Sequence, residues 1–148
     1  MVNLVEIDKI KVAASDFREA IEECKNSLGI SFRNFPRGSC GDVAPLLGTY
    51  LIENNLGKFE YYLGDYGVEP EENWSSHAWL QNGNLVVDIT ADQFPEISER
   101  VIVSVESLWH AKLCGKAQHI ADYRIYDPRT VANLGGMYRQ IKEHIKST

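Results

Sequence analysis

Three residues near the middle of the chain have side chains that together can perform nucleophilic catalysis. Cys40 supplies a thiol, His77 an imidazole and Asp88 a carboxylate. In such a set the thiolate attacks a carbonyl carbon, the histidine moves the proton, and the third group holds the histidine in the correct orientation. We therefore predict that Cys40 is a nucleophile, that His77 is its general base and acid, and that Asp88 orients His77.

The stretch 75–90 predicts a β-hairpin that brings His77 and Asp88 together. A two-residue type I′ turn needs positive φ at both central positions, and the Asn82-Gly83 pair tolerates this best. If that pair forms the turn, His77 lies directly opposite Asp88, where the carboxylate can accept a hydrogen bond from the imidazole. The alternative is a His–Asp pair on a solvated strand face. Apolar residues on the other face predict that the hairpin packs on a core; they are Ala78, Leu80, Leu85, Val87 and Ile89.

A helix is predicted to begin beside Cys40, because apolar residues recur at helical spacing from Val43 to Leu51. Pro45 is comfortable only in a first turn, which favours Asp42 as the cap and places Cys40 just before the helix. The positive end of a helix favours the thiolate, which is the nucleophilic form of cysteine. The alternative is that Cys40 is only a small residue beside a helix cap.

The remaining patterns predict an α+β fold in one domain spanning residues 1–148. The predicted elements are a helix over 16–28 that extends back towards Asp8 as either one helix or two, strands at 58–63, 75–81, 84–90 and 101–105, a further strand at 120–126, and a helix starting at Asp127-Pro128. Helices that precede a run of strands favour an antiparallel sheet covered by helices. Residues 64–73 are predicted to be a polar connection at the rim of a cleft.

Composition excludes several classes of partner. The net charge of −6 comes without a basic stripe, so no nucleic-acid partner is expected. No apolar run is long enough for a bilayer and no leader pattern is present, so we expect a cytoplasmic protein without membrane contact. Three widely spaced cysteines indicate reduced thiols rather than a disulfide framework. Cys24 lies on an apolar helical stripe and is predicted to be a core thiol.

Two stretches, GSCGDVAPLLGTYL and SHAWLQNGNLVVDITADQF, resemble the transglutaminase-like branch of the papain-like cysteine enzymes. The resemblance covers roughly residues 35–95. It implies a papain-like (transglutaminase-like) fold with N-terminal helices packed on an antiparallel sheet, and no cofactor. It assigns the nucleophile, the base and the orienting group to Cys40, His77 and Asp88.

The chain departs from that family at the group that stabilises the oxyanion. Gly41 follows Cys40 at the position where the family usually has Trp. Asn34 stands six residues before Cys40, where papain-like enzymes carry a Gln. Asn34, Gly41 and Trp79 are therefore the candidate oxyanion or substrate-binding residues.

The predicted activity is acyl transfer from an amide or peptide bond through a covalent thioester. A cysteine protease, an amidase, a glutamine deamidase and a transglutaminase all fit, with a peptide, a protein or a small amide as substrate and either water or an amine as acceptor. The first alternative is a transglutaminase-like binding module without catalysis. The second is a zinc-binding domain. Its ligands would be Cys40, His77 and Asp88, or His110 and Cys114 at i, i+4 spacing with His119.

Overall fold

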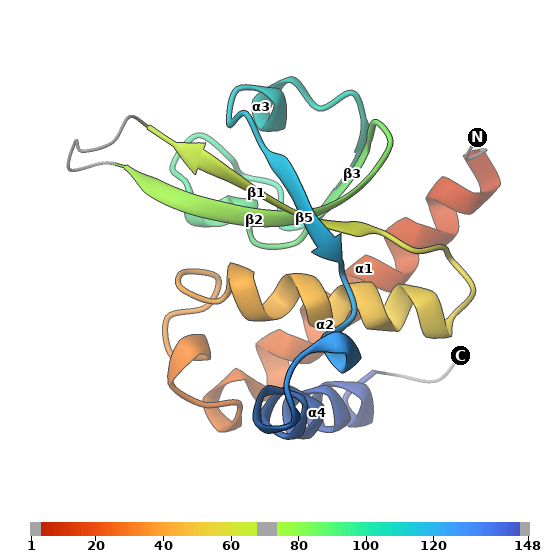
Figure 1. The fold of residues 1–148 in the computed structure, drawn as a ribbon, viewed down its shortest axis with the longest axis vertical. Coiled ribbons are helices and arrows are strands. Elements are labelled where there is room, and N and C mark those ends of the chain that lie inside the picture. Colours follow the sequence, from red (N-terminus) through yellow and green to blue (C-terminus); the bar gives the residue numbers. More distant parts are fainter. Residues whose placement is uncertain (1–3, 68–73, 146–148) are drawn as a thin grey trace.

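Helices and a single antiparallel sheet form separate layers (Figure 1) in the computed structural model, which describes residues 4–67 and 74–145. The predicted α+β class is therefore confirmed. The helices are α1 (Leu4–Cys24), α2 (Cys40–Glu53), α3 (Leu108–Ala111) and α4 (Pro128–Glu143). The strands are β1 (Glu60–Tyr66), β2 (Ser75–Asn82), β3 (Leu85–Asp88), β4 (Ile102–Val105) and β5 (Lys116–Ile120). They lie in the order β4-β3-β2-β1-β5.

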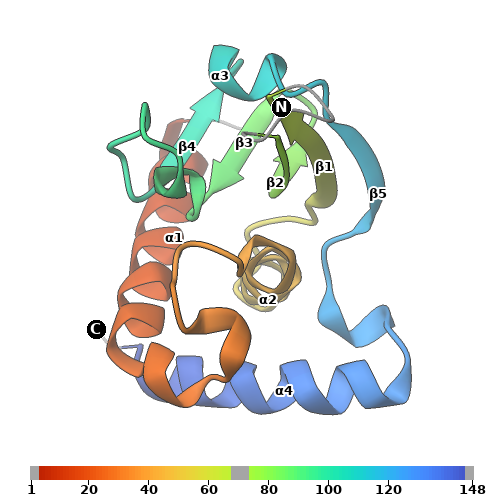
Figure 2. The same cartoon turned by 90° about the vertical axis from the view of Figure 1, so that its left-hand side faces the viewer.

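The central helix of the fold is α2. Figure 2 views it end-on, with α1, α4 and the sheet around it. Every residue from Val43 to Thr49 is buried, as expected for a helix that is apolar on most of its surface. The chain at Ala121 lies so close to α2 that a Cβ at Gly48 would be 2.1 Å from the Ala121 carbonyl oxygen. This close packing fixes the position of α2 and therefore of Cys40 at its first residue.

The helices at the two ends of the chain follow their sequence patterns. The first is one continuous helix, α1, rather than two. The last, α4, begins as predicted with Pro128 in its first turn, and the Asp127 side chain accepts a hydrogen bond from the Thr130 N–H. The strand predicted at 120–126 is wrong. Strand β5 ends at Ile120, and a short 3₁₀ turn follows at Tyr123–Ile125.

The hairpin of β2 and β3 forms as predicted, but its turn lies one residue further along the chain. Asn82 pairs with Leu85, so the turn residues are Gly83 and Asn84. Gly83 has a φ of 60°, and glycine at the first central position suits a type II′ turn. Asn82 stays in the strand, where its side chain donates a hydrogen bond to the Lys58 carbonyl oxygen. The predicted register was therefore wrong by two, and a shift of two residues leaves every side chain on its predicted face.

Both faces of the hairpin are buried. The face predicted to be apolar supplies Leu80 and Val87 to the main core, together with α1, α2 and α4. On the other face Trp79 and Val86 pack with Leu113 in a smaller cluster near α3. The functional candidates on this second face are therefore shielded from solvent.

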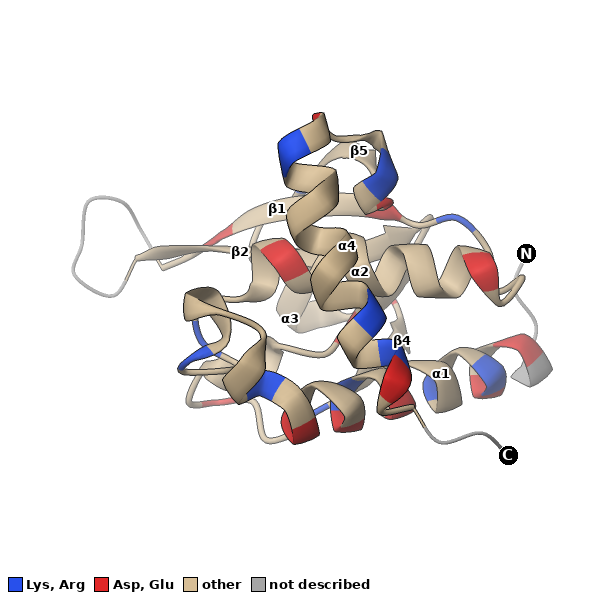
Figure 3. Ribbon diagram, turned by 90° about the horizontal axis from the view of Figure 1, so that it is seen from below, with Lys and Arg blue, Asp and Glu red and all other residues tan. Residues whose placement is uncertain are grey.

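The outer surface of the helical layer carries charges of both signs. Lys and Arg as well as Asp and Glu lie along α1 (Figure 3). Among the described helices none is sufficiently long and apolar to span a bilayer. The connection predicted over 64–73 is shorter at its start, because β1 continues to Tyr66, and its positions 68–73 lie outside the described residues.

Candidate active site

Cys40 is the first residue of α2, and Ser39 is its N-cap. The predicted cap at Asp42 was wrong, because the Asp42 carboxylate accepts a hydrogen bond from Ser31 Oγ instead. The Ser39 hydroxyl donates to the Pro36 carbonyl oxygen, so it does not cap the helix. Within the described residues, the backbone N–H groups of Cys40 and Gly41 consequently have no hydrogen-bond partner. These free donors lie at the positive end of a 14-residue helix, next to the thiol.

The predicted hydrogen bond between His77 and Asp88 is confirmed. His77 Nε2 lies 2.7 Å from Asp88 Oδ2, and both side chains are buried. The two residues are diagonal neighbours rather than directly opposed, because of the corrected register. The other carboxylate oxygen, Oδ1, accepts from the N–H of Thr90 at 2.9 Å and from its hydroxyl at 3.3 Å. The Asp88 carboxylate is therefore held at both oxygens.

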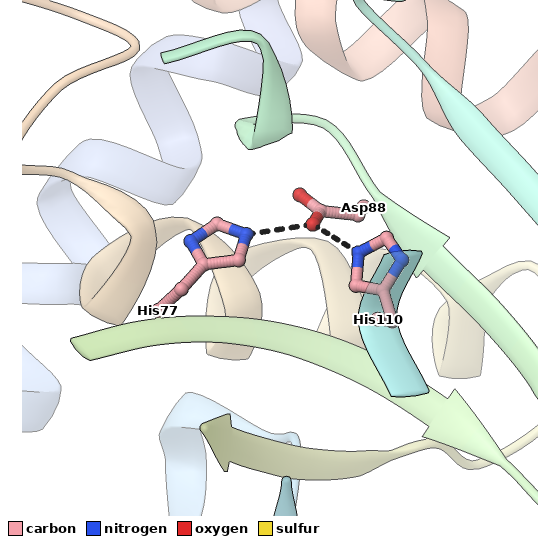
Figure 4. Close-up of side chains that lie close together, drawn as sticks. All are labelled: His77, Asp88 and His110. Atoms are coloured by element: carbon pink, nitrogen blue, oxygen red, sulfur yellow. Dashed lines mark hydrogen bonds and ion pairs between the residues drawn. The ribbon is translucent and has the colours of Figure 1, made fainter. Parts of the chain in front are cut away.

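A second histidine, His110, binds the same oxygen of Asp88 (Figure 4). Its Nε2 lies 2.7 Å from Oδ2, and its Nδ1 lies 2.7 Å from Ser107 Oγ. The proposed pairing of His110 with Cys114 and His119 as metal ligands is wrong. Cys114 is exposed, His110 is bonded to Asp88 and Ser107, and His119 is bonded to Tyr126. The sequence signals for His110 are its i, i+4 spacing to Cys114 and a serine three residues earlier, and neither points to Asp88.

Electrostatics favour an ion pair between His77 and Asp88. Burial disfavours the charged imidazolium, but the charge and hydrogen bond of Asp88 outweigh the effect of burial, and Cys40 acts in the same direction as Asp88. Together these effects raise the pKa of His77 to about 9. Burial also disfavours the carboxylate, but the charge of His77 and the hydrogen bonds from His110 and His77 hold the pKa of Asp88 well below its usual range. Cys40, at the start of α2, and Asp88, at the end of β3, also line the same small cavity. The three predicted catalytic side chains are therefore neighbours.

Gln93 contacts the remaining nitrogen of His77. Its Nε2 lies 3.3 Å from His77 Nδ1 and donates to the Thr90 carbonyl oxygen at 3.1 Å. A carbonyl oxygen needs a donor, so the NH₂ group, rather than the amide oxygen, faces the imidazole and can donate to Nδ1 only when His77 is neutral. Gln93 lies in the ADQF segment, at the end of the second stretch that resembles the transglutaminase-like enzymes, but no sequence pattern assigned a role to it.

Arg18 of α1 holds the segment that carries Gln93. Its guanidinium is buried, donates to the Ile89 carbonyl oxygen at 2.8 Å and binds both carboxylate oxygens of Asp92 at 2.8 and 2.9 Å. Bidentate Arg–carboxylate pairs fix both distance and orientation. The segment after β3 is therefore attached to a helix more than 70 residues earlier in the chain.

The residues predicted to bind substrate or oxyanion have different surroundings. Asn34 is exposed in a turn, and no described contact joins its side chain to the thiol. Trp79 is buried and packs beside the His77 ring, with its Nε1 donating to Gln81 Oε1. It is thus a packing residue rather than an exposed substrate contact.

Gly41 is exposed beside the Tyr61 hydroxyl, which lies 3.5 Å from where a Cβ of Gly41 would stand. Burial, followed by the charge of Cys40, raises the pKa of Tyr61 to about 12. Tyr61 therefore keeps its proton at neutral pH close to the thiol, a feature that sequence reasoning did not find.

His77, Asp88 and His110 form the one group among the described residues that has the composition of a metal site. The candidate set containing Cys40 is not assembled in this way. Zinc ligands at about 2.0–2.1 Å from the ion stand roughly 3.3 Å apart in a tetrahedron. The 2.7 Å separations here are shorter and match charge-assisted hydrogen bonds. The geometry is therefore that of a hydrogen-bonded network.

Comparison of the chain with protein-family models, curated proteins and solved structures finds no match. The argument for function consequently rests on the geometry of the site.

Proposed function

We propose that this protein is a thiol-dependent acyl-transfer enzyme that acts on amide or peptide bonds through a thioester on Cys40. The observation that carries the proposal is the position of His77, which is bonded through Nε2 to Asp88, while Asp88 and Cys40 line one small cavity at a helix N-terminus. The same order of elements, a helix bearing the thiol followed by antiparallel strands bearing the histidine and aspartate, supports a papain-like, transglutaminase-like fold.

The first half of the reaction forms the thioester. The Cys40 thiolate attacks the carbonyl carbon of the substrate, and the carbonyl oxygen becomes an oxyanion. The free N–H groups at the start of α2 donate hydrogen bonds to that oxygen. The C–N bond then breaks, and the His77 imidazolium gives its proton to the leaving amine.

The second half releases the acyl group. Neutral His77 accepts a proton from water or from an amine, which attacks the thioester carbonyl and restores the Cys40 thiolate. Asp88 keeps the Nε2 proton on His77 throughout, so that the other nitrogen is available to accept a proton. The acceptor decides whether the product is an acid or a new amide.

A buried ion pair supports the enzyme over a binding module that lacks catalysis. Removing charges from water is costly, and apolar residues of similar volume often stabilise a fold equally well. A module that only binds a partner has no need for the charged set of His77 and Asp88 beside a thiol.

The proposal is tested with p-nitrophenyl acetate, whose activated ester acylates a thiolate without requiring the natural substrate. We expect acetylation of Cys40 by peptide mapping, followed by release of acetate. The variant His77→Gln should lose at least about 100-fold in acetylation rate, in line with the loss of general acid–base catalysis. Cys114→Ser is the matched control, since Cys114 is an exposed thiol outside the site.

Equal acetylation of Cys40 and Cys114, unaffected by His77→Gln, would contradict the proposal and favour the binding module. If Cys40 does react, ammonia release from a glutamine peptide, peptide cleavage, and amide formation with added methylamine distinguish the deamidase, protease and transglutaminase reactions.

A further inference from the structure

One carboxylate oxygen accepts hydrogen bonds from two buried histidines. His77 Nε2 and His110 Nε2 each lie 2.7 Å from Asp88 Oδ2. The exposed fractions of His77, Asp88 and His110 are 0%, 3% and 2%, so water does not compete for these bonds. An oxygen that accepts two short bonds shares its negative charge between both donors. The interaction of Asp88 with His77 therefore depends on His110.

The ring of His110 is fixed from the far side. Ser107 Oγ lies 2.7 Å from His110 Nδ1 and also accepts from the His110 N–H, since Ser107 is the N-cap of α3. The rings of Trp79 and Trp109 meet it edge to face, with centroids 5.0 and 4.8 Å away. Consequently His110 presents one N–H group to Asp88 in a fixed direction.

We propose that His110 is a positioning residue for the acyl transfer proposed above, and that it acts through Asp88 on His77. It orients the carboxylate and limits how tightly that carboxylate retains the His77 proton. A general base works best when its pKa lies near the working pH, so a histidine paired to an unshared carboxylate would return its proton too slowly. This inference rests on the proposed function, but it concerns a residue that makes no contact with a substrate.

The surroundings of His77 separate this effect from others. The titratable groups that face it are Asp88 from β3, Cys40 from α2 and His110 from α3. The Gln93 amide faces its Nδ1 and carries no charge. Only His110 also shares Asp88, so a change at this position reaches His77 mainly through the carboxylate.

The test is an NMR titration of the His77 ring in three variants. His110→Phe keeps the ring volume but removes the donor, and we expect the midpoint of His77 to rise by about one pH unit because Asp88 then bonds to His77 alone. His110→Gln restores an N–H at the same reach and should return the midpoint close to the wild-type value. Ser107→Ala loosens the His110 ring and should shift the midpoint upward by less. His144→Gln, at the exposed end of α4, is the control and should change nothing.

A midpoint in folded His110→Phe that stays unchanged or falls would overturn the inference, as would failure of His110→Gln to restore it. Equimolar zinc in the wild type that is lost from His110→Phe would also overturn it, because the imidazoles would then be ligands. If His110→Phe does not fold, Ser107→Ala decides by the same criterion. The titration needs no turnover, so an inert Cys40 would refute the proposed function while leaving this result separate.

Discussion

Replacing Asp88 with asparagine tests the site most sharply, because the substitution preserves shape while it removes the charge and turns one acceptor oxygen into an NH₂ donor. Asp88 accepts four hydrogen bonds, two from imidazoles and two from Thr90. An asparagine can keep the Thr90 bonds through its oxygen, but its NH₂ group then faces both Nε2 atoms. The bonds survive only if both rings move their proton to Nδ1. His77 would then hold a proton on the nitrogen that has to accept one from Cys40.

The expected loss follows from the proton affinity of His77. Asp88 is the main cause that overcomes burial and raises its pKa from 6.5 to about 9, a difference worth about 3 kcal/mol. Without the carboxylate, only Cys40 opposes burial, so the pKa of His77 should fall well below its value of about 9. The imidazolium fraction at pH 7.5 falls accordingly, and the change of tautomer leaves Nδ1 unable to accept a proton, so the two effects together should lower the acylation rate by at least two to three orders of magnitude. A loss of about 10⁴ accompanies the same change in a serine-protease triad.

The assay is the rate of Cys40 acetylation by p-nitrophenyl acetate in wild type and Asp88→Asn, with ¹⁵N NMR reporting which ring nitrogen of His77 is protonated. Asp65→Asn is a control carboxylate change at an exposed site on β1. If Asp88→Asn keeps its acetylation rate within about threefold while His77 remains protonated at Nε2, Asp88 is not the orienting group. The reasoning from tautomer to rate would then be refuted.

Three further outcomes are expected. Iodoacetamide should label Cys40 faster than the exposed Cys114, and Cys24 slowest, because burial and the charge of Glu23 raise the pKa of the Cys24 thiol. Mass spectrometry of partial labelling checks this, and equal rates at Cys40 and Cys114 would count against activation of Cys40. Because the folded-state pKa of His77 is raised, its contribution to stability is complete below about pH 6.5 and is lost as pH rises through about 9. Urea unfolding at a series of pH values should show a fall of about 3 kcal/mol in the free energy of unfolding that His77→Gln lacks. The same pH dependence of that free energy in both proteins would contradict the prediction. Arg18→Met should lower the free energy of unfolding by about 3–5 kcal/mol, because it leaves the Asp92 carboxylate unpaired. A loss under about 1 kcal/mol in the same assay would mean that the segment after β3 is held in another way.

Local sequence patterns were enough to predict the parts of the site that lie within one element or one hairpin. Alternation placed His77 and Asp88 on one strand face, and helical periodicity placed Cys40 at a helix start. Both predictions tolerated errors. The turn was misplaced by one residue and the register by two, yet the faces were retained because strand periodicity is two. The helix boundary was misplaced by Pro45, which the second turn of α2 accommodates.

The sequence by itself determined the α+β class, the apolar central helix, the hairpin and the candidate nucleophile, base and orienting group, because each depends on residue type and short-range periodicity. Only the tertiary structure decided that His110 shares Asp88, that Gln93 faces His77 and that Arg18 holds the segment after β3 that carries Gln93. Asp88 and His110 stand 22 positions apart, and Arg18 stands 71 positions before its partner Ile89. Contacts at such separations follow from how the layers pack, and no local pattern encodes them.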